Sequence, residues 1–432
     1  MRRSIFALTA AVIGATSLGA QTIAIEGGTV HTMTGAPIQG GTVLIRDGSI
    51  VAVGQNVAVP AGARRIDARG RVVTPGLFDS GTNIGLVEIE QIVETNDFRI
   101  GGEEDDLVAA SFNVADGLNP NSIVIPITRV AGVTTAVSRP QGGLIAGQVV
   151  VIVLLGRDMD AMLVRTPVAM YGNLGESARG AIKGARGTTT LRLREVLSDA
   201  RAYARNRAAF ERGETREYAV SRSDLEALQM VLDRRIPLVL EAHRASDIQT
   251  ALRLAREFDF RLMIYGGTEG WMVADDLARA RIPVIVKVLE NLPNTFEKLG
   301  ATYENAARLR RAGVQVAITS GETFKSFNLR QEAGNAVANG LPYDDALRAI
   351  TLVPAQIWGL DGSYGSLAPG KVANVVVWGG DPLEMLTPVQ HVLIRGQEVP
   401  LASRETELRD RYLRIDDQTR TYQRGSQQAP RP

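Results

Sequence analysis

Residues 22–74 are dominated by short apolar runs separated by glycine, a pattern typical of strands and hairpins. Asp47-Gly48 stands between two of these runs, and this dipeptide is a strong signal for a tight β-hairpin. Similar apolar runs return near the other end of the chain, at residues 374–378 and 391–396. Two β-rich ends around a longer middle predict that both termini contribute strands to one small β-sandwich.

The middle of the chain alternates apolar strand patterns with helix patterns. We expect strands at residues 134–136, 149–155, 237–240, 261–265, 283–286 and 314–318, and helices at residues 191–210, 224–235, 247–258 and 303–312. Such alternation predicts a parallel sheet with helical crossovers, and the length fits eight βα units. The sequence therefore predicts a TIM-like (β/α)8 barrel over residues 75–362, with a composite β-sandwich built from residues 21–74 and 363–400.

The two ends of the chain carry further signals. Two arginines precede the apolar run at residues 5–15, and Ala20 offers a small residue before a cleavage point, so residues 1–20 are typical of a secretory signal peptide. The run is shorter than the ~20 residues that span a bilayer. We therefore expect a periplasmic or secreted protein with no membrane attachment after cleavage. Residues 401–432 are polar and predict a charged helix that continues into a partly disordered tail.

Composition narrows the chemistry. The 432 residues include 48 Lys+Arg against 47 Asp+Glu, and a net charge of +1 gives no field that would attract nucleic acid. The absence of cysteine excludes disulfides, thiolate metal sites and cysteine nucleophiles. The chain has three histidines, whereas a metallohydrolase commonly gathers several imidazoles in one site. His243 falls in the predicted barrel, whereas His31 and His391 fall in the predicted sandwich.

Two separated motifs resemble those of a known protein family. The first is IDARGRVVTPGLFD at residues 66–79, and the second runs from AITLVPA at 349–355 to GSLAPGKVAN at 365–374. Their order and content resemble the amidohydrolase superfamily, and more narrowly its imidazolonepropionase-like and secreted prolidase-like members, from about residue 22 to 396. The resemblance implies the same barrel and sandwich. It also implies hydrolysis of a C–N bond by a metal-bound hydroxide.

The resemblance assigns metal-ligand positions, and most of them carry other residues in this chain. The family ends its first barrel strand in Asp-x-His-x-His, whereas residues 79–83 read DSGTN, with Gly81 and Asn83 at the histidine positions. His243 stands at the fifth-strand histidine position, but glycine stands near the sixth-strand histidine, and Gly321 stands at the eighth-strand aspartate. Glycine has no ligating side chain and an amide is a poor zinc ligand. We therefore expect no standard zinc site and no cofactor.

A compensating metal site is the alternative. Asp79, Asn83, His243 and Glu322, with Glu241 nearby, are expected to meet where the strands end at the barrel mouth. Such an oxygen-rich set would suit a weakly held Mg, Mn or Ca ion better than zinc. Pairing of these acids with the chain's many arginines is the other interpretation.

A glycine-rich segment is expected to help bind the substrate. Residues 138–148, SRPQGGLIAGQ, resemble a loop of the secreted subgroup, whose backbone amides and Arg139 would cradle a substrate carboxylate. A plain βα connection is the alternative. The predicted substrate-binding residues are Arg139, Gln141, Gly142, Tyr265 and Glu269.

Two functions stay open at this point. The first is an exported amidohydrolase-like enzyme that cleaves a C–N bond in a non-peptide amide or a dipeptide with a degenerate metal site. In that case His243 with Glu241 would transfer the proton. The second is a catalytically silent relative that binds a small ligand or a partner through the same pocket. We expect a small amide or peptide as ligand and no nucleic acid, and a homo-oligomer stays open.

Overall fold

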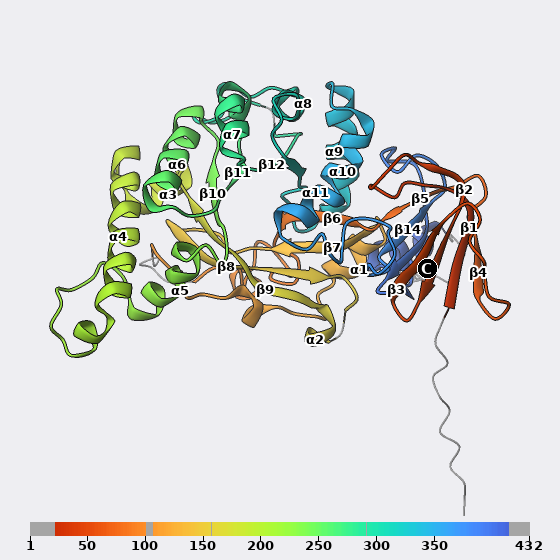
Figure 1. Ribbon diagram of the computed structural model, residues 1–432, viewed down its shortest axis with the longest axis horizontal. Coiled ribbons are helices and arrows are strands. Elements are labelled where there is room, and N and C mark those ends of the chain that lie inside the picture. The colour runs from red at the N-terminus through yellow and green to blue at the C-terminus, as the bar shows by residue number, and fades with distance from the viewer. Residues whose placement is uncertain (1–21, 101–106, 157, 291, 414–432) are drawn as a thin grey trace, which may run out of the picture.

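The computed structural model describes residues 22–100, 107–156, 158–290 and 292–413. The predicted signal peptide at residues 1–20 and the last part of the predicted tail lie outside the described residues. Two separate β-sheets organise the rest of the chain (Figure 1). Sheet A contains the strands of both ends, and the barrel sheet contains the strands of the middle.

Sheet A joins the two ends of the chain, as predicted. Its strands are β1 (Thr22–Val30), β2 (Ile38–Arg46), β3 (Ser49–Gly54), β4 (Arg64–Asp67), β5 (Val72–Pro75), β14 (Val375–Trp378), β15 (Val389–Ile394) and β16 (Gln397–Glu398). The junction is the antiparallel pairing of β5 with β14. The predicted hairpin is also confirmed: β2 and β3 are joined at Asp47 (φ 49°) and Gly48 (φ 78°), the left-handed pair that a tight hairpin requires.

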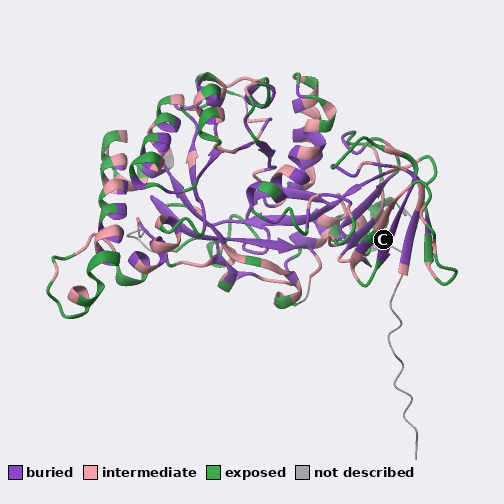
Figure 2. Ribbon diagram, viewed as in Figure 1, coloured by how far each residue is buried: buried purple, intermediate pink, exposed green. Residues whose placement is uncertain are grey.

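The barrel sheet has eight strands and is nearly closed, because β13 packs against β6. The strands are β6 (Leu77–Thr82), β7 (Val133–Ser138), β8 (Ile145–Val153), β9 (Leu163–Asn173), β10 (Leu238–Ala242), β11 (Leu262–Gly266), β12 (Val284–Val286) and β13 (Val316–Ile318). Every residue of β7 and β8 is buried, and Figure 2 shows the barrel strands mostly buried while exposed positions gather on the outer helices. The predicted TIM-like barrel is confirmed.

One strand runs against the prediction of eight parallel units. Strand β8 pairs antiparallel with both β7 and β9, whereas the other neighbouring strands are parallel. The reason is the connection: residues 139–144 alone separate β7 from β8, and a parallel crossover needs roughly a dozen residues or more. The glycine-rich segment is therefore a strand-to-strand turn and not the βα connection considered above.

Helices cover the outside of the barrel (Figure 1). They are α1 (Val124–Arg129), α2 (Met159–Met162), α3 (Glu176–Ile182), α4 (Arg186–Glu211), α5 (Arg222–Leu232), α6 (Ala245–Phe258), α7 (Ala274–Ala280), α8 (Asn305–Arg311), α9 (Leu329–Ala338), α10 (Tyr343–Ala349) and α11 (Leu352–Ile357). The four predicted helices correspond to α4, α5, α6 and α8. The charged helix expected after residue 401 forms as α12 (Arg404–Leu413). In the described part of the chain, no helix has the length and apolarity needed to cross a bilayer.

Arg330 ties the barrel to the segment that follows sheet A strand β14. This buried side chain of α9 donates hydrogen bonds to the carbonyls of Pro382 (2.6 Å), Thr387 (3.1 Å) and Glu384. Its guanidinium also lies 4.7 Å from the ring centroid of Trp378. One barrel side chain thus holds three backbone carbonyls beside sheet A.

Candidate active site

The carboxyl ends of the barrel strands bring most of the predicted site residues to one mouth. Asp79 lies on β6, Glu241 on β10 and Tyr265 on β11, while Arg139 and His243 directly follow β7 and β10. Parallel strands of a barrel end at the same face, where barrel enzymes carry their chemistry. His31 and His391 belong to the sheet A region, as expected, and His391 pairs with Glu398 there. The mouth is therefore the place to look for chemistry.

Asp79 is fully buried and belongs to a hydrogen-bond network that joins β6 to the end of β13. Its carboxylate accepts hydrogen bonds from the hydroxyls of Thr319 (2.5 Å) and Ser320, and from the backbone amides of Ser320 and Gly81 at 3.3 Å. Burial raises the pKa of Asp79, and the hydrogen bonds from Ser320 and Thr319 oppose this rise. Asp79 thus links β6 to the residues that follow β13 and does not face an open site.

Asn83 holds the turn between β7 and β8. Its amide nitrogen donates to the backbone carbonyl of Arg139 at 2.6 Å, and its amide oxygen accepts from Nε2 of Gln141 at 2.7 Å. The carbonyl of Gly142 in the same turn accepts from the Asn173 side chain at 3.0 Å. Gln141 and Gly142 also line a hollow of about 40 Å³ at the turn. Of the predicted loop residues, Gln141 contacts Asn83, and Arg139 contacts Tyr171 and Tyr265 at the mouth.

His243 and Glu241, the predicted catalytic pair, lie in the middle of a row of polar contacts that runs from Tyr171 through Glu241 and His243 to Thr268. His243 Nε2 lies 3.6 Å from Glu241 Oε1, and His243 Nδ1 lies 2.7 Å from the hydroxyl of Thr268. Tyr171 donates its hydroxyl to the other oxygen of Glu241 at 2.5 Å. Burial would raise the pKa of Glu241, but the neighbouring His243 and the charge of Arg139 outweigh burial and lower the pKa to about 2. Glu241 is therefore an anion at neutral pH.

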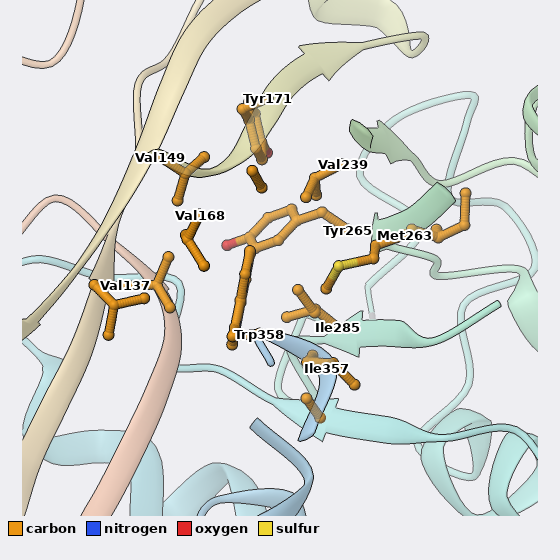
Figure 3. Packing of buried hydrophobic residues seen from close by; sticks show 14 of the residues in the cluster. Val137, Val149, Val168, Tyr171, Val239, Met263, Tyr265, Ile285, Ile357 and Trp358 are labelled. Atoms are coloured by element: carbon orange, nitrogen blue, oxygen red, sulfur yellow. The ribbon is translucent and has the colours of Figure 1, made fainter. Parts of the chain in front are cut away.

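Arg139 is buried between two tyrosine rings. The centre of its guanidinium lies 4.3 Å from the ring centroid of Tyr265 and 4.6 Å from that of Tyr171, and the two rings meet edge to face at 5.8 Å. Burial alone would lower the pKa of Arg139, but the oxygens of Tyr171 and Tyr265, followed by the negative charge of Glu241, raise it above its ordinary value. Figure 3 shows the Tyr265 side chain among the apolar residues of the barrel, close to Tyr171. The guanidinium is thus a fixed positive charge at the mouth.

Glu322 and Glu269, two further predicted residues, have partners of their own. Glu322 forms an ion pair with Lys287 at 2.7 Å, and although burial lowers the pKa of Lys287, the hydrogen bond that Lys287 donates to Glu322 raises it overall. Glu269 accepts hydrogen bonds from the backbone amides of Ala245 and Gly300, each at 2.9 Å. Glu269 therefore positions the start of α6 and the loop after β12.

The donor set at the mouth does not fit the metal that the resemblance implies. Within residues 22–413, leaving aside the undescribed segments, no three His, Cys, Asp or Glu side chains are arranged to hold a metal ion. The glycines at the ligand positions are also crowded. A Cβ at Gly81 would lie 2.5 Å from Cε2 of Tyr265, and one at Gly321 would lie 3.1 Å from Cδ of Lys287. Side chains of the protein itself fill the space next to these positions.

Sequence reasoning missed several side chains of the mouth. Tyr171 near the end of β9, Thr268 after β11 and Lys287 after β12 all contact predicted residues. Lys287 could have been predicted from the sequence, because it directly follows an apolar run and so lies at the end of a predicted strand, where barrel enzymes place site residues. Nothing in the local sequence marks Tyr171 or Thr268.

Comparisons with known proteins agree with this architecture. A family model described as the amidohydrolase family matches residues 238–399. The crystal structure of an amidohydrolase from Thermotoga maritima MSB8 is 31% identical, covers 88% of this chain and 99% of its own, and superimposes with a TM-score of 0.80. The chain belongs to the amidohydrolase family.

Curated members of the amidohydrolase family are more distant. Amidohydrolase tasK of Hapsidospora irregularis is 25% identical over 364 residues, which are 77% of this chain. This chain spans 37% of the length of tasK. The imidazolonepropionase of Acidiphilium cryptum (strain JF-5) is 24% identical, over 81% of this chain and 91% of its own. The predicted family is confirmed, and the activity within it is a separate question.

Proposed function

We propose that this amidohydrolase binds a small amide or peptide at the barrel mouth and does not carry out metal-dependent hydrolysis. The observation that carries the proposal is the mutual pairing of the polar side chains at the mouth. Asp79 is bonded to the end of β13, Asn83 to the β7–β8 turn, and Glu322 to Lys287. These partners would have to be displaced before a metal ion could use the side chains as ligands.

The protonation of Glu241 supports the same conclusion. A general base is most effective when its pKa lies near the working pH. The pKa of Glu241 is lowered to about 2, so this carboxylate accepts a proton poorly at neutral pH. The row around Glu241 therefore suits binding better than proton transfer.

The charged groups that still reach solvent indicate the class of ligand. The side chains of Glu241, Lys287 and Glu322 are 25%, 21% and 40% exposed. A ligand with both an ammonium and a carboxylate, such as a dipeptide, finds a partner for each charge in this set. We expect the binding to take place outside the cytoplasm, because residues 1–20 have the pattern of a secretory signal peptide.

Metal-independent hydrolysis is the second candidate function. The observation that favours it is the placement of His243, whose ring is fixed by Thr268 and whose Nε2 faces Glu241. A positioned imidazole beside a carboxylate is the usual arrangement for acid–base catalysis. In this case His243 would move the proton and Glu241 would orient the ring.

One experiment separates the two functions. Dipeptides and cyclic amides are titrated into the protein by calorimetry, and the same mixtures are checked for cleavage products by mass spectrometry. We expect saturable binding without products, and we expect Lys287→Met to weaken it. Arg310→Met, which breaks an ion pair with Asp345 (3.1 Å) between α8 and α10, is the matched control and should bind normally. Products that disappear in His243→Asn would establish hydrolysis instead, and a panel without any binding would refute the proposal.

A further inference from the structure

One tyrosine covers two of the family's ligand positions. The ring of Tyr265 lies where a side chain on Gly81 would project, and its hydroxyl would lie 3.3 Å from a Cβ at Gly321. These glycines stand on β6 and after β13, on neighbouring sides of the mouth. Tyr265 itself projects into the barrel (Figure 3). The space that ligands on these two strands would share is therefore taken by an aromatic ring.

The guanidinium of Arg139 lies against this ring. It contacts the face of Tyr265 and that of Tyr171, and the whole residue is only 8% exposed. An arginine cannot be deprotonated under ordinary conditions, so the buried group carries a permanent positive charge. A buried cation needs a nearby anion. Glu241 is the carboxylate joined to this arrangement, because its Oε2 accepts the hydroxyl of Tyr171 at 2.5 Å and the guanidinium of Arg139 lies 4.6 Å from the centroid of the same ring.

The residue at the second family histidine position anchors this arrangement. Asn83 donates its side-chain amide to the carbonyl of Arg139 at 2.6 Å, and the amide of Arg139 donates to the carbonyl of Thr82 at 3.0 Å. The backbone of Arg139 is thus fixed on both sides by the end of β6. The short turn between β7 and β8 begins at this residue, so the antiparallel strand and the placed arginine belong to one local structure.

We propose that Arg139 is the resident cation of the barrel mouth, which balances Glu241 from between Tyr171 and Tyr265 and leaves no place for a divalent metal. Tyr265 fills the ligand positions, Asn83 holds the arginine, and the guanidinium supplies the positive charge. This arrangement concerns the resting protein. It holds whether the ligand at the mouth is only bound or also cleaved.

The first arm of the test uses the unaltered full-length protein. Zinc, manganese and magnesium chlorides are titrated into it by calorimetry, and melting temperatures are recorded with each salt. We expect no binding of one equivalent at the mouth and no rise in melting temperature. One equivalent of tightly bound metal that is lost in Glu241→Gln would overturn the proposal. Because this arm needs no variant at Arg139, it does not depend on the folding of one.

The second arm replaces the cation. Arg139→Met should lower the melting temperature because Glu241, whose side chain is only 25% exposed, loses the positive charge of Arg139, and adding Glu241→Gln should recover most of the loss. Millimolar methylguanidinium should partly restore Arg139→Ala, whereas zinc should not. Arg308→Met is the matched control, because it removes a half-buried arginine that lies 4.5 Å from the ring centroid of Trp271 and pairs with Glu304 at 2.7 Å. Its effect should be smaller and unaltered by Glu241→Gln. An Arg139→Met protein as stable as the unaltered one would refute the proposal.

Discussion

Replacing Gly81 with alanine tests whether Tyr265 fills the former ligand position. The backbone of Gly81 is not in the left-handed region, so alanine is tolerated there by conformation and the effect is steric. The added Cβ would lie 3.3 Å from Cζ of Tyr265 and 2.5 Å from Cε2, and the second distance is closer than real Cβ contacts. The ring must move, and the guanidinium of Arg139 packs against the face of the same ring. Gly81→Ala therefore disturbs the whole mouth.

The expected magnitude follows from two opposing effects. Forcing an extra methyl into a packed interior typically costs about 1–3 kcal/mol. Replacing glycine with alanine where the backbone allows it stabilises by about 0.4–1 kcal/mol through the unfolded chain. The steric effect is larger, so we expect Gly81→Ala to lower the free energy of unfolding by roughly 1–2 kcal/mol.

Urea unfolding followed by tryptophan fluorescence measures this change. Gly187→Ala is the matched control: Gly187 lies in α4, a Cβ there meets nothing within 4 Å, and the variant should be up to about 1 kcal/mol more stable. In a Tyr265→Leu background the penalty of Gly81→Ala should shrink, because contacting residues are not additive. If Gly81→Ala is as stable as the unaltered protein, or if the two substitutions add, the ring does not fill this position.

Three further predictions concern other contacts of the barrel. Burial raises the pKa of Glu332 from 4.5 to about 7, against the opposing amide of Leu289, so the folded state keeps a proton that the unfolded chain releases. The free energy of unfolding should therefore fall by up to about 3 kcal/mol as the pH rises from 4.5 to 7. In Glu332→Gln this contribution is absent, so the midpoint of urea unfolding should depend less on pH across that window. Arg330→Met should cost on the order of 3 kcal/mol by calorimetric unfolding, because three carbonyls lose their donor; a neutral result would show that the tie to sheet A is dispensable. Asn83→Ala should cost about 1–3 kcal/mol in the same assay, because the carbonyl of Arg139 is left buried without its donor, and an unchanged melting curve would contradict that role.

Much of the fold could be predicted because short-range sequence patterns determine many of its strands, helices and turns. The Asp47-Gly48 turn requires two left-handed residues, and the apolar runs around it form the expected hairpin. The direction of β8 could not be read in this way, because an apolar run looks the same in either direction. Only the length of the connection at residues 139–144 decides it, and the glycines there also suit a binding loop.

The candidate site was less accessible to sequence reasoning. The pairing of Glu241 with His243 follows from alternation along one strand, which places both side chains on one face. The partners that fix their chemistry come from strands far apart in the chain, such as Tyr171 and Thr268. The resemblance assigns family ligand positions to Gly81 and its counterparts. The structure adds that another side chain occupies the space.

Elemental analysis of the full-length protein, purified without chelator and without added metal, tests the central claim most directly. If Arg139 is the cation of the mouth, zinc, manganese, iron and nickel should each remain far below one equivalent per chain after dialysis. Near one equivalent of a divalent metal that survives dialysis and disappears in Glu241→Gln would contradict the account.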